Sequence, residues 1–175
     1  FFSEAEVNGF KLKFADLPRD YGVLKATVGV NRTNAAELKN WKLEGFARVV
    51  REFPQISWLQ VGDFGEPVVP GSINLLGMTT LRELLWILSQ AKILLSVEGF
   101  LTHASAAFNV PTVVPFTGGH EPKGLLYPCT VPVLPTPIPV CMPCWGSTCS
   151  IDGMPCRNDI SEEAVLAAVT KEILQ

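Results

Sequence analysis

The chain has 175 residues, of which 47% are hydrophobic, and its 14 basic and 17 acidic residues give a formal net charge of −3. This length and apolar content fit one globular domain with a sizeable core, with room for a small appendage, and they exclude global disorder. The slightly acidic balance argues against a general nucleic-acid or membrane-surface binder, which needs a basic face.

The first segment, 1–22, mixes charged and aromatic residues without a clear period. Phe10, Leu12 and Phe14 alternate with lysines, so a short strand or an irregular strap is expected here. The early charges, including Glu4 and Glu6, do not fit a signal peptide. We expect 1–22 to be a linker or strap from an N-terminal domain that this sequence does not contain.

Residues 23–128 together with 158–175 are predicted to form one α/β domain. β-Branched and apolar runs predict strands at 24–30, 56–61, 93–97 and 112–116, with a brief strand or a loop at 73–76. Helical spacing of apolar residues predicts helices over 39–53 and 80–88, and small residues after Gly99 predict a third helix. Because strands and helices alternate, we expect a Rossmann-like parallel sheet flanked by helices.

Two helix starts have clear signals. Thr80 and Glu83 form a capping box, and the apolar residues that follow continue the helix. Ser161 caps the last helix, with Glu162 and Glu163 in its first turn. The apolar segment 84–97 is interrupted by charged and polar residues, so we interpret it as helix then strand and predict no membrane span.

Polar residues and glycines follow the strands predicted at 93–97 and 112–116. In an open parallel sheet, the carboxyl ends of strands and the amino ends of the next helices form the ligand crevice, where helix N–H groups suit a phosphate. The residues expected there are Glu98, Thr102, His103, Gly118 and Gly119. Taken alone, the stretch fits an ordinary strand–helix–strand core unit with a capping polar turn equally well.

Residues 129–157 form a proline-rich segment with all five cysteines of the chain. Cys141, Cys144, Cys149 and Cys156 are spaced as Cys-x2-Cys-x4-Cys-x6-Cys. Four thiolates suit a structural zinc or iron, which would pin a loop that prolines keep irregular. Two disulfides or free thiols are the alternatives, and without a signal sequence the metal is favoured over disulfides.

Several motifs occur in a fixed order. They are Lys39-Asn40-Trp41, Gln60-x-Gly62-x3-Glu66, Asn74-Leu75-x-Gly77-x-Thr79-Thr80-Leu81-x-Glu83-Leu84, Glu98-Gly99-x3-His103-x2-Ala106-Ala107, and Phe116-x-Gly118-Gly119. Over residues 24–174 this set resembles the carboxyl-terminal domain of the heptosyltransferase-like glycosyltransferases, family 9, which have the two-Rossmann GT-B fold. The cysteine-rich tail is similar to the four-cysteine iron-binding finger of the autotransporter heptosyltransferases in that family.

The resemblance implies that this chain is the donor domain of an inverting glycosyltransferase. The donor would be an ADP- or UDP-linked sugar, and the transferred hexose or heptose would go to a lipopolysaccharide or to a protein hydroxyl. The acceptor glycan, lipid or protein and the general base would be held by the N-terminal domain. The resemblance also implies a bacterial, cytoplasmic enzyme that forms a homo-oligomer.

By residue match, Lys39 would pair with the donor phosphates and Glu66 with the ribose hydroxyls. Gly99 would present helix N–H groups to the diphosphate, and His103 would lie near the phosphates or the sugar as the one catalytic candidate. The full set of implied donor residues is Arg32, Lys39, Glu66, Glu98, Gly99, Thr102, His103, Gly118 and Gly119. Each of these residues, taken singly, also fits a structural role such as a surface lysine, a solvated turn or a core histidine.

One stretch departs from the family pattern. Many members have Asp-Ser/Thr-Gly before the histidine, whereas here Val97-Glu98-Gly99 precedes a gap that is one residue longer. The departure indicates a sub-branch with a different donor or a changed turn. It also keeps open the alternative of a non-catalytic binding or assembly module, stapled by a metal, that retains half of a GT-B fold.

Overall fold

A computed structural model describes residues 1–28, 38–119, 121–124, 127–146 and 148–174. These residues contain a six-stranded sheet in the order β3-β2-β1-β4-β5-β6, and every neighbouring pair is parallel. The strands are β1 (Tyr21–Lys25), β2 (Ser57–Gln60), β3 (Ile73–Asn74), β4 (Ile93–Ser96), β5 (Thr112–Pro115) and β6 (Thr130–Val133). The strand order reverses between β1 and β4, and sheets of this kind bind ligands at such a switch point.

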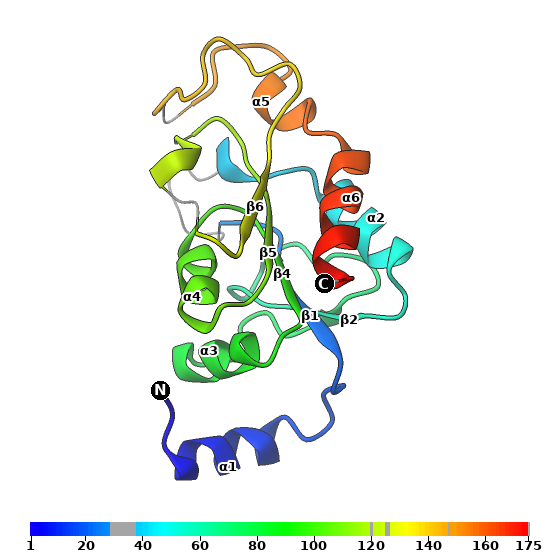
Figure 1. Cartoon of the computed structure of the whole chain (residues 1–175), viewed down its shortest axis with the longest axis vertical. Helices are drawn as coiled ribbons and strands as arrows, with labels where there is room; N and C mark the ends of the chain where they lie inside the picture. Colours follow the sequence, from blue (N-terminus) through cyan, green and yellow to red (C-terminus); the bar gives the residue numbers. More distant parts are fainter. Residues whose placement is uncertain (29–37, 120, 125–126, 147, 175) are drawn as a thin grey trace.

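Helices cover both faces of the sheet (Figure 1). Helices α2 (Leu43–Glu52) and α6 (Glu162–Ile173) lie on one face, and α3 (Leu81–Ser89) and α4 (Phe100–Phe108) lie on the other. Further helices in the described part of the chain include α1 (Glu4–Lys13), the short 3₁₀ helix η2 (Pro122–Gly124) and α5 (Pro155–Asn158). The predicted fold class, a parallel sheet flanked by helices, is therefore confirmed.

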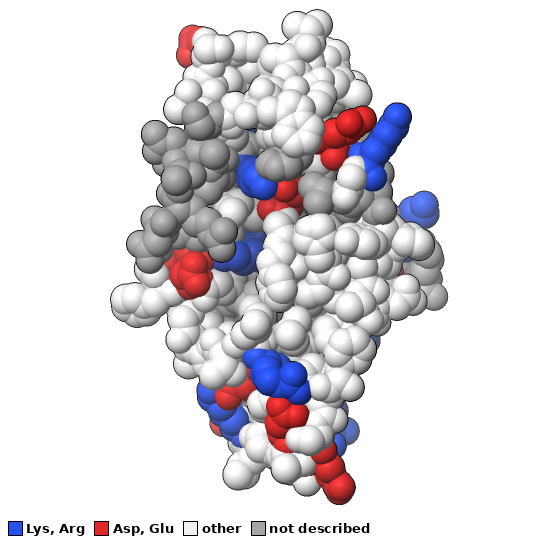
Figure 2. Space-filling model, turned by 90° about the vertical axis from the view of Figure 1, so that its left-hand side faces the viewer, with Lys and Arg blue, Asp and Glu red and all other residues white. Residues whose placement is uncertain are grey.

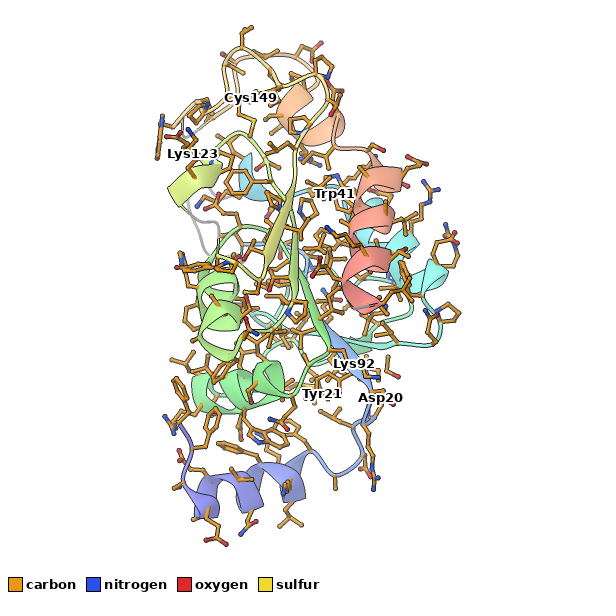
Figure 3. All side chains as sticks on the ribbon, in the orientation of Figure 1. Asp20, Tyr21, Trp41, Lys92, Lys123 and Cys149 are labelled. Atoms are coloured by element: carbon orange, nitrogen blue, oxygen red, sulfur yellow. The ribbon has the colours of Figure 1, made fainter. Side chains whose placement is uncertain are left out.

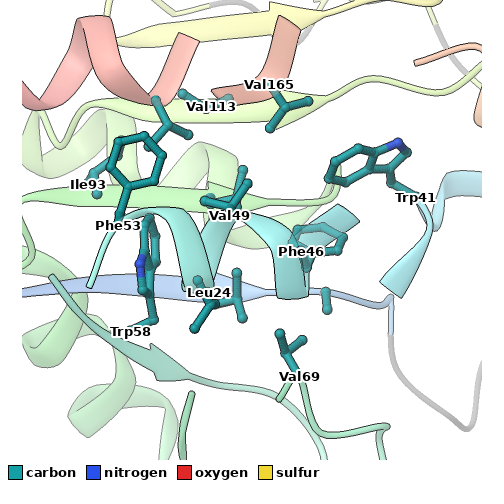
Figure 4. Packing of buried hydrophobic residues seen from close by; sticks show 14 of the residues in the cluster. Leu24, Trp41, Phe46, Val49, Phe53, Trp58, Val69, Ile93, Val113 and Val165 are labelled. Atoms are coloured by element: carbon teal, nitrogen blue, oxygen red, sulfur yellow. The ribbon is translucent and has the colours of Figure 1, made fainter. Parts of the chain in front are cut away.

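The core is divided by the sheet into two apolar clusters. One cluster lies under α2 and α6 and includes Phe46, Trp58 and Val165, which Figure 4 shows around Leu24. The other lies under α3 and α4 and includes Leu59, Ile87 and Leu94. Since a strand of a doubly covered sheet is buried on both faces, β4 and β5 are buried throughout, and apart from Ser96 they consist of apolar or β-branched residues.

The predicted helix caps are present. The Thr80 side chain accepts from the Glu83 N–H, and the Glu83 carboxylate accepts from the Thr80 N–H, which completes the capping box of α3. The Ser161 hydroxyl accepts from the Ala164 N–H at the start of α6. No helix in the described ranges has both the length and the apolar character needed to cross a membrane.

Segment 1–22 differs from the expected short strand, because Glu4–Lys13 forms helix α1. Ser3 and Glu6 form a capping box, a start signal that the alternation of Phe10, Leu12 and Phe14 obscured. The helix packs its aromatic side chains against Trp86 of α3, with ring centroids 5.7 Å (Phe10) and 6.4 Å (Phe14) away. Nothing in α1 is buried, so the helix lies on the α3 surface rather than in the core.

Two strands also differ from the prediction. β1 begins at Tyr21 and ends at Lys25, whereas the sequence predicted a strand over 24–30, of which residues 29 and 30 lie outside the described ranges. Gly22 hid the start of this strand, although a Cβ there would lie 2.7 Å from the Trp58 ring, so the strand needs a glycine at that point. The segment 129–157 contributes β6 to the edge of the sheet, where Pro132 is tolerated because only one side of the strand needs to pair.

Two glycines in helices should respond to the same substitution with opposite signs. Gly45→Ala places a Cβ 2.5 Å from Cζ2 of the buried Trp41 ring, so we expect overpacking to lower the free energy of unfolding by about 1–3 kcal/mol. A Cβ at Gly9 in α1 would meet nothing within 4 Å, so we expect Gly9→Ala to raise the free energy of unfolding by roughly 0.5–1 kcal/mol, the helix preference of alanine over glycine. Urea unfolding of both variants tests this, and equal effects would contradict it.

Candidate functional site

A cavity of about 410 Å³ opens at the carboxyl ends of β1, β2 and β4. Its walls also include the amino ends of α3 and α4, so it lies where the strand order reverses. The charged and polar side chains that line it are those of Lys25, Thr27, Lys39, Asp63, Thr79, Ser96 and Glu98. Figure 2 shows basic and acidic side chains next to one another across the middle of one face of the molecule.

The first charged pair of the cavity joins Lys39 to Glu98. The Lys39 Nζ donates to the Glu98 Oε1 at 2.7 Å, and their side chains are 20% and 4% exposed. Glu98 lies two residues after the end of β4, and the intervening Val97 donates its N–H to the carbonyl of Lys25 in β1. The carboxylate is therefore buried in the cavity wall, and the ammonium is the more accessible end of the pair.

The second pair joins Lys25, the last residue of β1, to Glu66 in the turn after β2. Glu66 Oε1 accepts from the Lys25 Nζ and, at 2.8 Å, from the Asp63 N–H, while Oε2 accepts from the Thr27 hydroxyl at 2.6 Å. The Glu66 side chain is 0% exposed and the Lys25 side chain 17%. Again the lysine faces the cavity, and the glutamate lies beneath it.

The amino end of α4 faces the same cavity without a side-chain cap. Its N-cap residue is Gly99, which makes no side-chain hydrogen bond, and a Cβ there would meet nothing within 4 Å. By contrast, α3 starts at a complete capping box. Because the first N–H groups of a helix lack intrahelical partners and carry a partial positive charge, the α4 start suits an anion.

Two further predicted donor residues, Thr102 and His103, are not among those that line the cavity. Thr102 is buried in α4, and its Oγ1 has no hydrogen-bond partner among the described residues. His103 is exposed on α4, with Nδ1 2.7 Å from the Tyr127 hydroxyl. Arg32 lies outside the described residues.

Gly118 and Gly119 line a second, smaller cavity of about 60 Å³ with the predicted metal ligands. A Cβ on Gly118 would lie 3.0 Å from the Cβ of Cys156, and the Gly118 carbonyl accepts from the Cys144 N–H at 2.9 Å. Gly119 lies next to the side chain of Lys39, because a Cβ there would lie 3.7 Å from Cγ of Lys39. The glycine turn therefore connects the cysteine segment to the Lys39 side chain.

Cys141, Cys144, Cys149 and Cys156 all line this small cavity, and all are free thiols, so the structure does not support the disulfide alternative. Burial raises the pKa of the Cys156 thiol, and the charges of the three other cysteines raise it further. Among the described residues, however, no group of three or more His, Cys, Asp and Glu side chains is arranged to hold a metal ion. The predicted metal-stapled loop is therefore not confirmed. Figure 3 shows Cys149 near α5, at the carboxyl end of the sheet.

Sequence reasoning missed Lys25 and Thr27 as cavity residues. The strand predicted at 24–30 placed both in its interior, whereas β1 ends at Lys25 and releases the next residues into the cavity wall. The observable signal was the lysine itself, because a charged residue is out of place inside a doubly covered parallel strand.

Comparisons with known proteins identify the fold. No protein-family profile and no curated protein sequence matches the chain. Among solved structures, it is similar to the ADP-heptose lipopolysaccharide heptosyltransferase II of E. coli, with a TM-score of 0.71 and 16% identity over 100% of this chain and 53% of that one. It is also similar to a family 9 glycosyltransferase of Veillonella parvula, with a TM-score of 0.68 and 18% identity over 97% and 51% of the two chains.

A third neighbour is TibC, an iron-containing dodecameric glycosyltransferase of enterotoxigenic E. coli, with a TM-score of 0.72 and 16% identity over 91% of this chain and 47% of that one. TibC is also known in complex with ADP-D-beta-D-heptose. These neighbours are thus heptosyltransferases and a family 9 glycosyltransferase, and the chain has the fold of one half of a GT-B glycosyltransferase. It spans about half the length of these neighbours, and identities this low establish the fold alone.

The buried position of Glu66 makes its charge necessary for stability. Glu66→Gln leaves the mostly buried Lys25 ammonium without its counter-charge, and we expect the free energy of unfolding to fall by about 3 kcal/mol. Glu52→Gln, on the exposed end of α2, is the matched control and should change it by less than about 0.5 kcal/mol. Denaturant unfolding monitored by circular dichroism compares the two, and a near-neutral Glu66→Gln would show that the pair contributes little.

Proposed function

We propose that this chain forms the nucleotide-sugar-binding half of an inverting glycosyltransferase that resembles the heptosyltransferases. The observation that carries the proposal is the cavity at the switch point of the sheet, which combines Lys25, Lys39 and the uncapped start of α4. Two ammonium groups and free helix N–H groups fit the charge of a diphosphate. The ADP-heptose bound by TibC, a neighbour in fold, supports the same ligand class.

The half-site suits the leaving group of the transfer. In an inverting reaction the acceptor oxygen attacks the anomeric carbon, the bond from that carbon to the diphosphate oxygen breaks, and a base takes the acceptor proton. Lys39 and the α4 N–H groups would stabilise the negative charge that develops on the departing diphosphate. The base and the acceptor, a lipopolysaccharide or a protein hydroxyl, belong to the other half of the enzyme in this proposal.

We do not assign a catalytic role to His103. Its ring is exposed and its Nδ1 is engaged by the Tyr127 hydroxyl, and it is not among the residues that line the cavity. A contact with the sugar of the donor is the role that remains for it, because the helix that carries it begins at the cavity wall.

Calorimetry with ADP- and UDP-linked sugars tests the proposal. We expect one of the two nucleotides to bind, and Lys39→Ala to weaken that binding by about tenfold or more, because a charge-assisted hydrogen bond is lost. Lys92→Ala is the matched control, since Lys92 pairs with Asp20 at 2.8 Å at the amino end of the sheet (Figure 3), away from the cavity. A folded chain that binds neither ligand would overturn the donor-site proposal and favour a non-catalytic binding or assembly module.

We also propose that the four cysteines that line the small cavity bind a structural zinc or iron. The support is their shared cavity, their free thiols and the iron content of TibC. Such a site would close with four thiolates and leave no open coordination position, so its role would be to hold the proline-rich segment.

Elemental analysis of the purified chain tests the metal. We expect about one zinc or iron per chain, as a tetrahedral four-thiolate site holds one ion. Cys149→Ser should lower the metal content, whereas Cys129→Ser should not, since Cys129 is half-buried beside β6 and does not line the cavity. Metal-free protein with all four thiols open to a thiol reagent would rule the site out.

A further inference from the structure

Only one partner of the Lys25–Glu66 ion pair faces the cavity. Glu66 is fully buried and does not line the cavity, whereas Lys25 and Thr27 do. Three donors already engage the Glu66 carboxylate, namely the Lys25 ammonium, the Thr27 hydroxyl and the Asp63 N–H. A carboxylate has about four acceptor sites, so Glu66 retains little capacity for a ligand.

The pair is held in place by a glycine. A Cβ on Gly62 would lie 2.5 Å from Oε2 of Glu66 and 2.7 Å from Nζ of Lys25, so no other residue fits at this strand end without displacing one of them. Lys25 therefore stands in a fixed position, with one of its three ammonium donors assigned to Glu66. Such a lysine presents a positive charge to the cavity with little freedom left to lose when a ligand binds.

Lys25 and the phosphate-binding elements lie side by side. In the β1–β4 ladder, Lys25 is the register partner of Ser96, and Glu98, Gly99 and α4 follow directly from there. Lys39 reaches the same cavity from the segment before α2. The cavity thus holds two lysines, and each one covers a buried glutamate.

We propose that Lys25 is a ligand-binding residue that contacts the diphosphate together with Lys39, and that Glu66 is a positioning residue that acts through Lys25 and Thr27. This inference rests on the proposed nucleotide-sugar site. It gives Lys25 a direct ligand contact, and it leaves Glu66, which the resemblance paired with the ribose hydroxyls, without one. It also takes one carboxylate out of the charge balance of the cavity, because Glu66 lies buried behind Lys25, and the Glu98 carboxylate in the cavity wall is neutralised by Lys39.

The test is a double-mutant cycle on ADP binding by calorimetry, with UDP in its place if the wild type prefers uridine. Lys25→Met removes the charge at similar volume, and we expect ADP affinity to fall about tenfold or more, as for Lys39→Met. Glu66→Gln keeps the lysine charge and should cost less affinity than Lys25→Met. Lys92→Met, at the amino end of the sheet, should bind as the wild type does.

The combined Lys25→Met/Glu66→Gln variant distinguishes a loss of ADP affinity from a loss of stability. Because both charges are removed together, no buried charge is left unpaired, and its stability should lie above that of Lys25→Met alone. If Lys25 contacts the ligand, this stable double variant still binds ADP about tenfold or more weakly. If the double variant binds ADP as the wild type does, the pair is only structural and the inference is overturned.

Two further results are decisive. A large loss of affinity in Glu66→Gln with none in Lys25→Met would indicate that Glu66 itself contacts the ligand and would overturn the inference, while the proposed donor site would stand. A folded wild-type chain that binds neither ADP nor UDP would overturn the proposed function itself, and this inference with it.

Discussion

The site depends on how this chain buries two carboxylates at the carboxyl edge of its sheet. Glu66 and Glu98 are 0% and 4% exposed, and each is neutralised by a lysine that remains the more accessible partner. A buried carboxylate without a partner would cost several kcal/mol, so each glutamate fixes its lysine in one position. The fold thereby converts a pair of acidic residues into a cavity that presents ammonium groups.

The strand order places this site at the switch point of the sheet, between β1 and β4. The carboxyl ends of β1 and β4 diverge in their connections, since β1 leads toward α2 on one face and β4 leads into α4 on the other. The cavity lies at these two connections, and both Lys25 and Glu98 line it. The same reversal of strand order leaves the α4 start uncovered, so helix N–H groups and lysines face one volume.

The sequence predicted the parts of this structure that local patterns specify. The capping box of Thr80 and Glu83, the cap at Ser161 and the apolar run of β4 each depend on neighbouring residues, and all three are confirmed. The end of β1 was predicted too late, because β-branched residues beyond Lys25 continue the strand pattern while the pairing stops. Which residue of an ion pair is buried depends on contacts between segments that are distant in the sequence. The spacing of Lys25 and Glu66 therefore could not predict that the lysine, rather than the glutamate, faces the cavity.

The cysteine segment and the main cavity are joined through a single turn. The Cys144 N–H donates to the Gly118 carbonyl, Cys156 packs against Gly118, and the next residue, Gly119, lies behind the stem of Lys39. Lys39 in turn pairs with Glu98 at 2.7 Å in the cavity wall. A Cβ at Gly118 would lie 3.0 Å from the Cβ of Cys156, which gives this glycine a packing role in addition to any contact with a donor. Order in the cysteine segment therefore supports the position of Lys39, and anything that holds the four thiols in place also steadies one of the two ammonium groups of the cavity.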